Sequence, residues 1–289
     1  MNYSIIYSLK FIIKFRYRNT LLGISRYIYW QFLKIFNLFP RDVNFSKSKI
    51  HFSDLNLASQ GGTKLFCCGV YDYDNMFFAR DLLMLYTGVF IDVGANIGVY
   101  SVFMSELSSI KVVSIEPHPI TYEHLLKNVH INRRVNIMSF NNAIGNNENF
   151  IKFSDIPGSS INKVVDSNSQ SKYILVKQKK LSKIIDKINI SPAVVKIDTE
   201  GYELHVLEGM DEYLKDVKML IIEISKDWEE INKILAPYFD GPFYVDYKNK
   251  LIKKEKYYSE DPVYINKLFV NEILKQLNFQ YSFSKLRHV

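Results

Sequence analysis

The sequence predicts a doubly wound α/β domain built on a mostly parallel sheet and preceded by a helical extension. From residue 89 onward, short runs of consecutive apolar residues alternate with segments of helical period. Runs of this kind are typical of strands that are buried on both faces, and helices between them favour parallel crossovers. A glycine-containing loop follows the first run, where such folds bind their ligands.

Nine apolar runs are predicted to form strands. They are Val89–Val93, Lys111–Glu116, Val135–Phe140, Tyr173–Val176, Ala193–Asp198, Met219–Ile224, Phe243–Tyr247, Leu251–Ile252 and Tyr264–Val270. Helices are predicted between them, at 98–108, from Pro119 to Asn132, over Leu181–Ile188, from 199 to Leu214 and from Asp227 to Tyr238. Pro119 suits the first turn of its helix. Residues 141–178 are otherwise polar and rich in Ser and Asn, so we expect mostly loop there.

Charge divides the chain into two expected parts. Residues 1–49 hold nine Lys and Arg and one acid, a net charge of +8, whereas residues 50–289 hold 28 basic and 29 acidic residues, a net charge of −1. We therefore expect a basic amphipathic helical extension over 1–49 and one domain over 50–289. Because the second part is nearly neutral, a broad nucleic-acid-binding face is not expected.

The N-terminal segment 1–39 has two interpretations. Apolar residues from Ile5 to Ile13 recur at helical spacing beside a stripe of basic residues, and a second helix is predicted from Asn19 to Phe39, with Pro40 ending it. The helices pack on the rest of the chain, or they make a peripheral membrane contact. A spanning helix is not expected, because no run reaches about 18 apolar residues without a charge.

The motif Asp92-Val93-Gly94-Ala95-Asn96-Ile97-Gly98 lies at a predicted strand-to-helix turn. Glu116 ends the next predicted strand, where a carboxylate can accept the hydrogen bonds of a ribose. A nicotinamide dinucleotide is disfavoured, because Asn96 stands where its fingerprint has glycine and Asp92 would repel pyrophosphate. The same charge suits S-adenosylmethionine, which carries an amino group and a sulfonium.

The segment Phe90–Ser101 resembles the first motif of FkbM-type methyltransferases, and Val195–Glu203, with the phrase Val-Lys-Ile-Asp-Thr-Glu-Gly-Tyr-Glu, resembles a second. Glu116-Pro117 and Asn142–Gly145 stand between them in that family's order. The resemblance covers roughly residues 69–270. It implies a seven-stranded, Rossmann-like methyltransferase sheet whose last strand is antiparallel, and O-methylation with S-adenosylmethionine as the methyl donor.

The resemblance also implies roles for residues of the donor site. Asp92, Gly94, Ala95, Asn96 and Gly98 would form the loop around the methionine end, and Glu116 would hold the ribose. Three further residues, Asn142, Ala143 and Ile144, would border the adenine. The acceptor implied is a hydroxyl of a sugar, glycan or glycolipid precursor, and neither its identity nor the oligomeric state follows from these motifs.

Asp198 and Glu200 are the candidate catalytic residues, because they end a later strand at the same sheet edge. An alcohol is a poor nucleophile, so a carboxylate that takes its proton can speed transfer by about 10²–10⁴. His205 is a weaker candidate. No metal is expected, since two nearby acids are too common to indicate one.

Two other functions stay open at this stage. They are a nicotinamide-dependent oxidoreductase and a non-catalytic, membrane-peripheral binding protein that retains the fold. The adjacent cysteines Cys67 and Cys68 imply no disulfide framework, and a cytoplasmic location, peripheral at the inner face of the membrane under the second interpretation of the arm, fits this composition.

Overall fold

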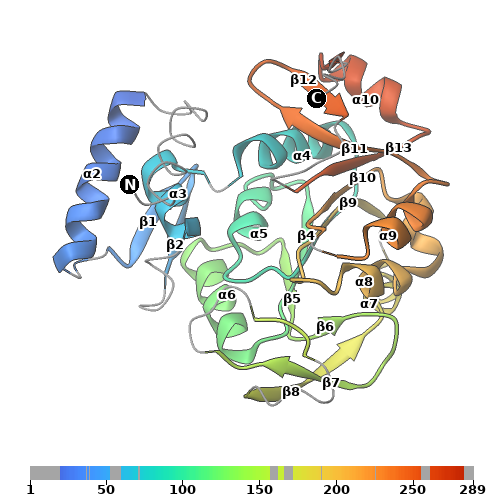
Figure 1. The fold of residues 1–289 in the computed structure, drawn as a ribbon, viewed down its shortest axis with the longest axis horizontal. Coiled ribbons are helices and arrows are strands. Elements are labelled where there is room, and N and C mark those ends of the chain that lie inside the picture. The colour runs from blue at the N-terminus through green and yellow to red at the C-terminus, as the bar shows by residue number, and fades with distance from the viewer. Residues whose placement is uncertain are drawn as a thin grey trace, which may run out of the picture.

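A computed structural model describes residues 20–36, 38, 40–52, 60–70, 72–156, 162–165, 172–189, 191–224, 226–254 and 261–282. Among them, no helix has the length and apolar character needed to cross a membrane. The chain forms a central twisted sheet with helices on both faces, and an N-terminal part stands at one end of the molecule (Figure 1).

The central sheet has the strand order β14-β12-β11-β13-β10-β9-β3-β4-β5. From one edge to the other the bounds are β14 Gln280–Ser282, β12 Leu251–Lys254, β11 Phe239–Asp246, β13 Val263–Asn266, β10 Met219–Ile222, β9 Pro192–Ile197, β3 Val89–Val93, β4 Lys111–Ile115 and β5 Ile137–Phe140. Neighbours from β10 to β5 pair in parallel, whereas β13 is antiparallel to both β10 and β11. The mostly parallel sheet and its late antiparallel strand agree with the prediction.

The strand count of this sheet differs from the seven expected. Seven strands, from β11 to β5, correspond to the predicted sheet, and β12 and β14 extend it to nine. The extension arises because β12 pairs as a hairpin with β11, and the last described residues then add β14 parallel to β12. The short apolar run Leu251–Ile252 does not indicate that a further strand pairs with it.

Alternate side chains of the strands enter two separate apolar cores. Phe90 and Val194 pack with α4 (Tyr73–Leu85), α5 (Val99–Met104) and α10 (Val270–Gln276) on one face. Ile91 and Val195 pack on the other face with α7 (Leu181–Ile188), α8 (Glu203–Glu208), the 3₁₀ helix η1 (Asp211–Asp216) and α9 (Trp228–Leu235). The result is a three-layer architecture in which the carboxyl ends of β3, β4 and β9 share one edge.

Several element boundaries differ from the prediction. The helix expected from 199 to Leu214 is divided into α8 and η1, because the chain turns at Gly209 and a Cβ there would lie 2.1 Å from the carbonyl oxygen of Gly145. The run Tyr264–Val270 is a strand only to Asn266, and α10 begins at Val270.

A small sheet was largely missed from the polar stretch 141–178. It has the order β6-β8-β7, formed by Ala143–Ile144, Tyr173–Lys179 and Phe150–Ser154. Only β8 was expected. The β7–β8 pair is antiparallel and partly exposed, so its sequence lacks the continuous apolar run of a central strand.

The N-terminal part contains helix α2 (Thr20–Phe36), the hairpin β1 (Asp42–Phe45) and β2 (Ser48–His51), and helix α3 (Gln60–Cys68). Trp30 fixes α2 on α3: its indole Nε1 donates a 2.9 Å hydrogen bond to Thr63 Oγ1, and its ring stacks on Phe66. Helix α2 of the N-terminal segment 1–39 is therefore packed on the rest of the chain, which is the first of its two interpretations. The helix expected near Ile5–Arg18 lies outside the described residues.

The hairpin, which crosses the expected boundary at residue 49, is joined to the main domain by polar contacts. The buried carboxylate of Glu106 accepts hydrogen bonds of 2.8–2.9 Å from the hydroxyls of Ser46 and Ser48 and the amide of Lys47. Asn128, on α6 (Pro119–Ile131), accepts the amide hydrogen of His51 at 2.7 Å. The contacts hold β1 and β2 against the domain.

Candidate active site

A cavity of about 490 Å³ opens at the carboxyl ends of β3, β4 and β9. This is the place where doubly wound sheets bind ligands. Its walls come from the loops that follow these strands, from Phe52, Gly62 and Leu65 of the N-terminal part, and from Phe153 and Val164 near the small sheet. All predicted site residues except Gly98 line this cavity.

The loop after β3 is held between its two neighbouring strands. The amides of Gly94 and Ala95 each donate a 2.9 Å hydrogen bond to the carbonyl oxygen of Ile115, at the end of β4. Gly94 has φ +77°, and a Cβ there would lie 1.8 Å from the carbonyl oxygen of Asp198. Glycine is therefore required at this position by backbone conformation and by close approach of β9.

Gly98 has a packing role. It precedes α5 with φ +86°, and a Cβ there would lie 3.3 Å from Leu125 Cγ of α6. Because it does not border the cavity, its expected donor contact has no support in the geometry. Its spacing in the motif reflects the start of α5 instead.

Glu116 is buried at the edge of the cavity, and its carboxylate is fixed as a hydrogen-bond acceptor. Its two carboxylate oxygens accept hydrogen bonds of 2.9 Å from the backbone amides of Asn96 and His118. Burial raises the pKa of Glu116 to about 7, although both hydrogen bonds favour the ionised form. The side chain is thereby fixed where the sequence expects a ribose.

Asp92 lies deeper than expected. Its carboxylate is only 1% exposed and accepts a 2.6 Å hydrogen bond from Ser101, whose hydroxyl in turn accepts one from Ser114. Burial raises the pKa of Asp92, and the nearby Lys196 counteracts that rise. The carboxylate of Asp92, which was expected at the mouth of the loop, is therefore buried, and Ser101 and Lys196 stabilise its negative charge inside the protein.

Residues 142–144 form another side of the cavity. Asn142 is buried and donates a 3.1 Å hydrogen bond to the carbonyl oxygen of Lys177. Ala143 and Ile144 form β6, which pairs with β8. The small sheet therefore forms one wall of the cavity together with Asn142.

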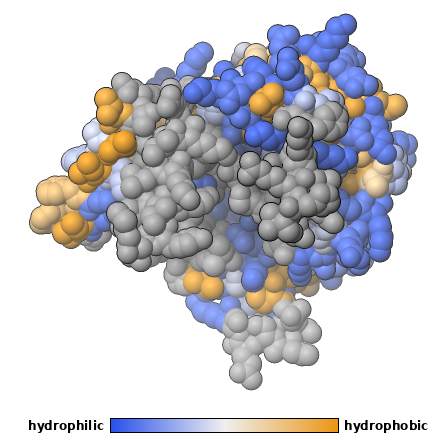
Figure 2. All heavy atoms as spheres, turned by 45° about the horizontal axis from the view of Figure 1, so that its top comes forward, coloured by the Kyte–Doolittle hydropathy of each residue, from blue (hydrophilic) through white to orange (hydrophobic). Residues whose placement is uncertain are grey.

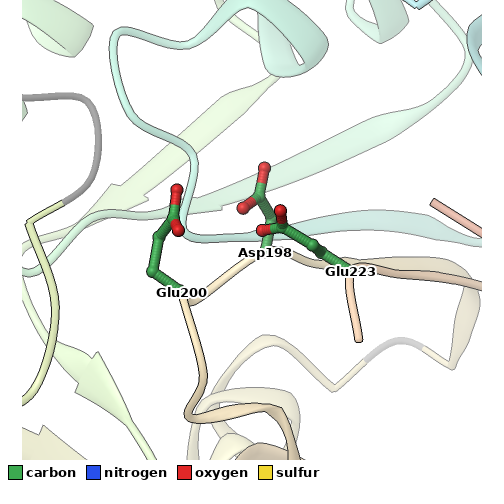
Figure 3. Close-up of side chains that lie close together, drawn as sticks. All are labelled: Asp198, Glu200 and Glu223. Atoms are coloured by element: carbon green, nitrogen blue, oxygen red, sulfur yellow. The ribbon is translucent and has the colours of Figure 1, made fainter. Parts of the chain in front are cut away.

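Three carboxylates gather where β9 and β10 end. Asp198 and Glu200 follow β9, Glu223 follows β10, and oxygen atoms of all three lie within 4.8 Å of one another. Figure 3 shows Glu223 reaching toward Asp198, with Glu200 beside them. This spacing allows the group to share a proton or a hard cation, and the expectation of no metal stays a prediction.

Lys196 is the cation of the site. It is 3% exposed, and its ammonium donates a 2.7 Å hydrogen bond to Asp198. Burial alone would lower the pKa of Lys196, but the charges of Asp198, Asp92 and Asp261 raise it. Burial likewise raises the pKa of Asp198, but Lys196 outweighs it and lowers that pKa. Asp198 is therefore held ionised.

The other acids of the cluster bind protons more readily. Burial and the charge of Asp198 raise the pKa of Glu200. Burial, together with the hydrogen bond to Asp198, raises the pKa of Glu223 above its usual range. The cluster therefore places an ionised carboxylate next to two carboxyls whose pKa values are raised.

Glu203 and His205 lie beside the site without lining it. Glu203 accepts hydrogen bonds from the amides of Thr199 and Gly201 and so fixes the turn that carries Glu200. His205 is partly exposed and contacts Glu208 at 3.1 Å. The ranking of His205 below the two acids agrees with this geometry.

Sequence reasoning missed Lys196, Glu223, Tyr100 and Tyr202 as members of the site or its immediate surroundings. Lys196 carried a usable signal, because a lysine inside a buried apolar strand must find a counter-charge. Glu223 also carried one, as an acid at the carboxyl end of the strand beside β9. The cavity walls from α3 and β7 carried none, since tertiary packing alone brings them there.

The description "Methyltransferase FkbM domain" belongs to the family model that matches residues 92–281. That match spans the glycine loop, Glu116, the acid cluster and the sheet as far as β14. The chain belongs to the FkbM methyltransferase family.

Relatives of this FkbM chain include the hexuronic acid methyltransferase AglP of Haloferax volcanii, 29% identical over 150 residues. The match covers 50% of this chain and 60% of AglP, so the chain aligns with less than two thirds of that relative's length. Similar solved structures include a precorrin-6y C5,15-methyltransferase from Geobacter metallireducens, with 13% identity, a TM-score of 0.37 and coverage of 66% of this chain and 85% of that one. An rRNA methylase from Streptococcus thermophilus has 9% identity, a TM-score of 0.38 and coverage of 65% and 92%.

Proposed function

We propose that this FkbM protein is an S-adenosylmethionine-dependent O-methyltransferase acting on a hydroxyl of a sugar, glycan or glycolipid precursor. The observation that carries the proposal is that one cavity holds two kinds of acid. Glu116 is fixed as a hydrogen-bond acceptor on the side proposed for the methyl donor. Asp198 and Glu200 form a pair on the side proposed for the hydroxyl that is methylated. Family membership supports methyl transfer, and the name of AglP supports a sugar-containing acceptor.

The residues present fit the proposed donor. A cavity of about 490 Å³ lies within the range of about 300–1,000 Å³ that is usual for ligands of this size. Glu116, already oriented by two amides, has lone pairs for ribose hydroxyls. Gly94, Ala95 and Asn96 would hold the methionine end with Asp92 beneath them, and Asn142, Ala143 and Ile144 would border the adenine.

The acid pair would act on the acceptor. When bound, S-adenosylmethionine supplies an electrophilic methyl group. Asp198, held ionised by Lys196, is suited to accept a hydrogen bond from the acceptor hydroxyl and so orient its oxygen. Glu200, whose pKa is raised, is better matched to take the hydroxyl proton as the C–O bond forms. In this proposal Asp198 aligns the nucleophile and Glu200 receives the proton.

The cellular setting belongs to the same proposal. Cys67 and Cys68 are both buried free thiols, and burial raises the pKa of each to about 12. Free thiols of this kind suit the reducing cytoplasm. We therefore place the reaction there.

Calorimetry with S-adenosylhomocysteine and NAD in parallel tests the donor assignment. We expect the first to bind and NAD not to bind, and Glu116→Ala to weaken binding by about 1.5–3 kcal/mol through loss of charge-assisted hydrogen bonds. Glu230→Gln, at an exposed position on α9, is the matched control. Binding of NAD without S-adenosylhomocysteine would instead indicate an oxidoreductase.

Transfer of labelled methyl groups into sugar, glycan and glycolipid precursors tests the acid pair. We expect Asp198→Asn and Glu200→Gln to lower turnover, by about 10²–10⁴ for the residue that takes the proton. Donor affinity should change less than about threefold, because Glu116 and the glycine loop hold the donor. Normal turnover in both variants would mean that positioning alone drives transfer. Loss of donor binding in both would move the pair into the donor half.

A further inference from the structure

Helix α2 carries large apolar side chains on two opposite sides. Tyr27, Trp30 and Leu33 are buried on one side. The opposite side holds a second set of large apolar side chains, all of them exposed: Leu22, Ile28, Tyr29, Phe32, Ile35 and Phe36. These six form the exposed face of α2. A contiguous exposed apolar patch of this kind marks a surface that contacts a partner or a membrane.

The six residues form one continuous surface. Ile28, Phe32 and Ile35 follow the spacing i, i+4, i+7, and the other three lie seven residues apart in the adjacent row. Ile28 is 65% exposed and Ile35 77%. Figure 2 shows apolar side chains gathered at the end of the molecule where α2 lies, at the left.

One polar group within this face is already satisfied. Ser25 lies in the same arc, and its hydroxyl donates a 2.9 Å hydrogen bond to the carbonyl oxygen of Leu22 within the helix. A hydroxyl bonded in this way costs little when it enters an apolar environment. The other polar atom of this face, the hydroxyl of Tyr29, suits the boundary between lipid and water, where tyrosine keeps its ring in the apolar layer and its hydroxyl in contact with water.

Charge selects the kind of partner. Helix α2 contains Arg26 and Lys34 and no acid, and residues 1–49 as a whole carry a net charge of +8. A second copy of the chain would add a segment of equal positive charge, which opposes association. An anionic lipid surface attracts it, with about 1 kcal/mol for each well-placed basic residue.

We propose that the exposed face of α2 lies in the interfacial layer of an anionic bilayer, parallel to the surface. The packed side of the helix stays on α3 through Trp30 and Phe66. The two interpretations of the arm are thus compatible, since one side of α2 binds the protein and the other binds lipid. This inference does not depend on methyl transfer.

The position of α3 links this surface to the cavity. Helix α3 packs against α2, and its residues Gly62 and Leu65 line the cavity. Docking through α2 therefore brings one wall of the cavity close to the lipid headgroups. If the proposed function holds, this geometry favours an acceptor carried on a lipid over a free sugar.

Vesicle co-sedimentation of the full chain tests the proposal, with vesicles of phosphatidylcholine alone or mixed equally with phosphatidylglycerol. We expect preferential, salt-sensitive binding to the anionic vesicles. The triple variant Ile28→Ser, Phe32→Ser, Ile35→Ser should bind at least about tenfold more weakly, because three apolar side chains that would be buried in the lipid are removed. The matched control is Val135→Ser with Leu268→Ser, at positions that are 98% and 82% exposed elsewhere.

Three results would overturn the proposal. Equal sedimentation of the triple variant would place the lipid contact elsewhere. A concentration-dependent dimer that the triple variant loses would assign the face to a second copy. Absence of vesicle binding would indicate that another segment of the chain covers the face. S-adenosylhomocysteine affinity, measured on the same samples, reports folding and tests the proposed function separately, because α2 does not line the cavity.

Discussion

Glu116 makes donor binding depend on pH in a direction that can be calculated. Its pKa in the free protein is raised to about 7 by burial, whereas ribose hydroxyls donate to the ionised form. The fraction ionised rises from about one tenth at pH 6 to about nine tenths at pH 8. Affinity for S-adenosylhomocysteine should therefore increase about tenfold over this interval, which is about 1.4 kcal/mol.

Replacing Glu116 with Gln removes the titration and keeps the shape. We expect Glu116→Gln to bind more weakly at pH 8 and to show no slope between pH 6 and 8 by calorimetry. Burial also raises the pKa of Asp261 to about 7, so Asp261→Asn is the control and should keep the slope. A flat profile in the unmodified protein, or a slope that Asp261→Asn abolishes, would refute the reasoning.

The same group predicts how stability depends on pH. Because the folded pKa of Glu116 lies above its unfolded value of about 4.5, its contribution is fully present below pH 4.5 and is lost as pH rises through 7. A shift of about 2.5 units corresponds to about 3 kcal/mol of unfolding free energy. Urea titrations at pH 5 and pH 8 should therefore show a smaller loss in Glu116→Gln than in the unmodified protein.

Three further substitutions test other parts of the structure. Gly94→Ala places a Cβ 1.8 Å from the carbonyl oxygen of Asp198, so we expect a loss of about 3 kcal/mol or more by urea unfolding together with loss of donor binding. Glu106→Gln removes the charge that faces Arg80 at 3.2 Å and misdirects a buried amide, which should cost about 1–3 kcal/mol in the same assay. Lys196→Met should raise the pKa of Asp198, so the acid limb of the methyl-transfer pH profile should move to higher pH.

Each of these has a conservative partner as its control. Gly98→Ala meets only Leu125 and should cost less than Gly94→Ala. Glu148→Gln, at an exposed position, should leave the free energy of unfolding unchanged. Lys196→Arg keeps the cation and should keep the pH profile. An unchanged profile in Lys196→Met would mean that Asp198 does not depend on this lysine.

Much of the central sheet could be predicted because its signals are local. A continuous apolar run such as Val89–Val93 marks a buried strand by itself, and parallel strands bring their carboxyl ends to one edge. The sequence alone therefore places Asp92, Glu116 and Asp198 at one edge of the sheet. The role of Gly98 stays a prediction, because a motif position alone does not distinguish a ligand contact from helix packing.

The parts that could not be predicted depend on distant contacts. The cavity walls at Leu65 and Phe153 come from segments far from the motifs in sequence, and nothing in their composition marks them. Strand β14 exists only because β12 offers it an edge. The exposed face of α2 was equally hidden, since the sequence shows an apolar helix but not which of its sides the protein covers.

The placement of Lys196 has an evolutionary consequence. It lies directly opposite Asp92 across the β3–β9 pair and hydrogen-bonds Asp198 two residues further along, so one ammonium compensates acids from both halves of the cavity. A mutation that removes the lysine leaves the buried Asp92 and the partly exposed Asp198 without their cation, whereas loss of one acid leaves the other to balance it. Selection therefore acts on the three positions as a unit. Changes at 92, 196 and 198 should be mutually epistatic, and a library that varies them together should recover folded combinations that no series of single substitutions can reach.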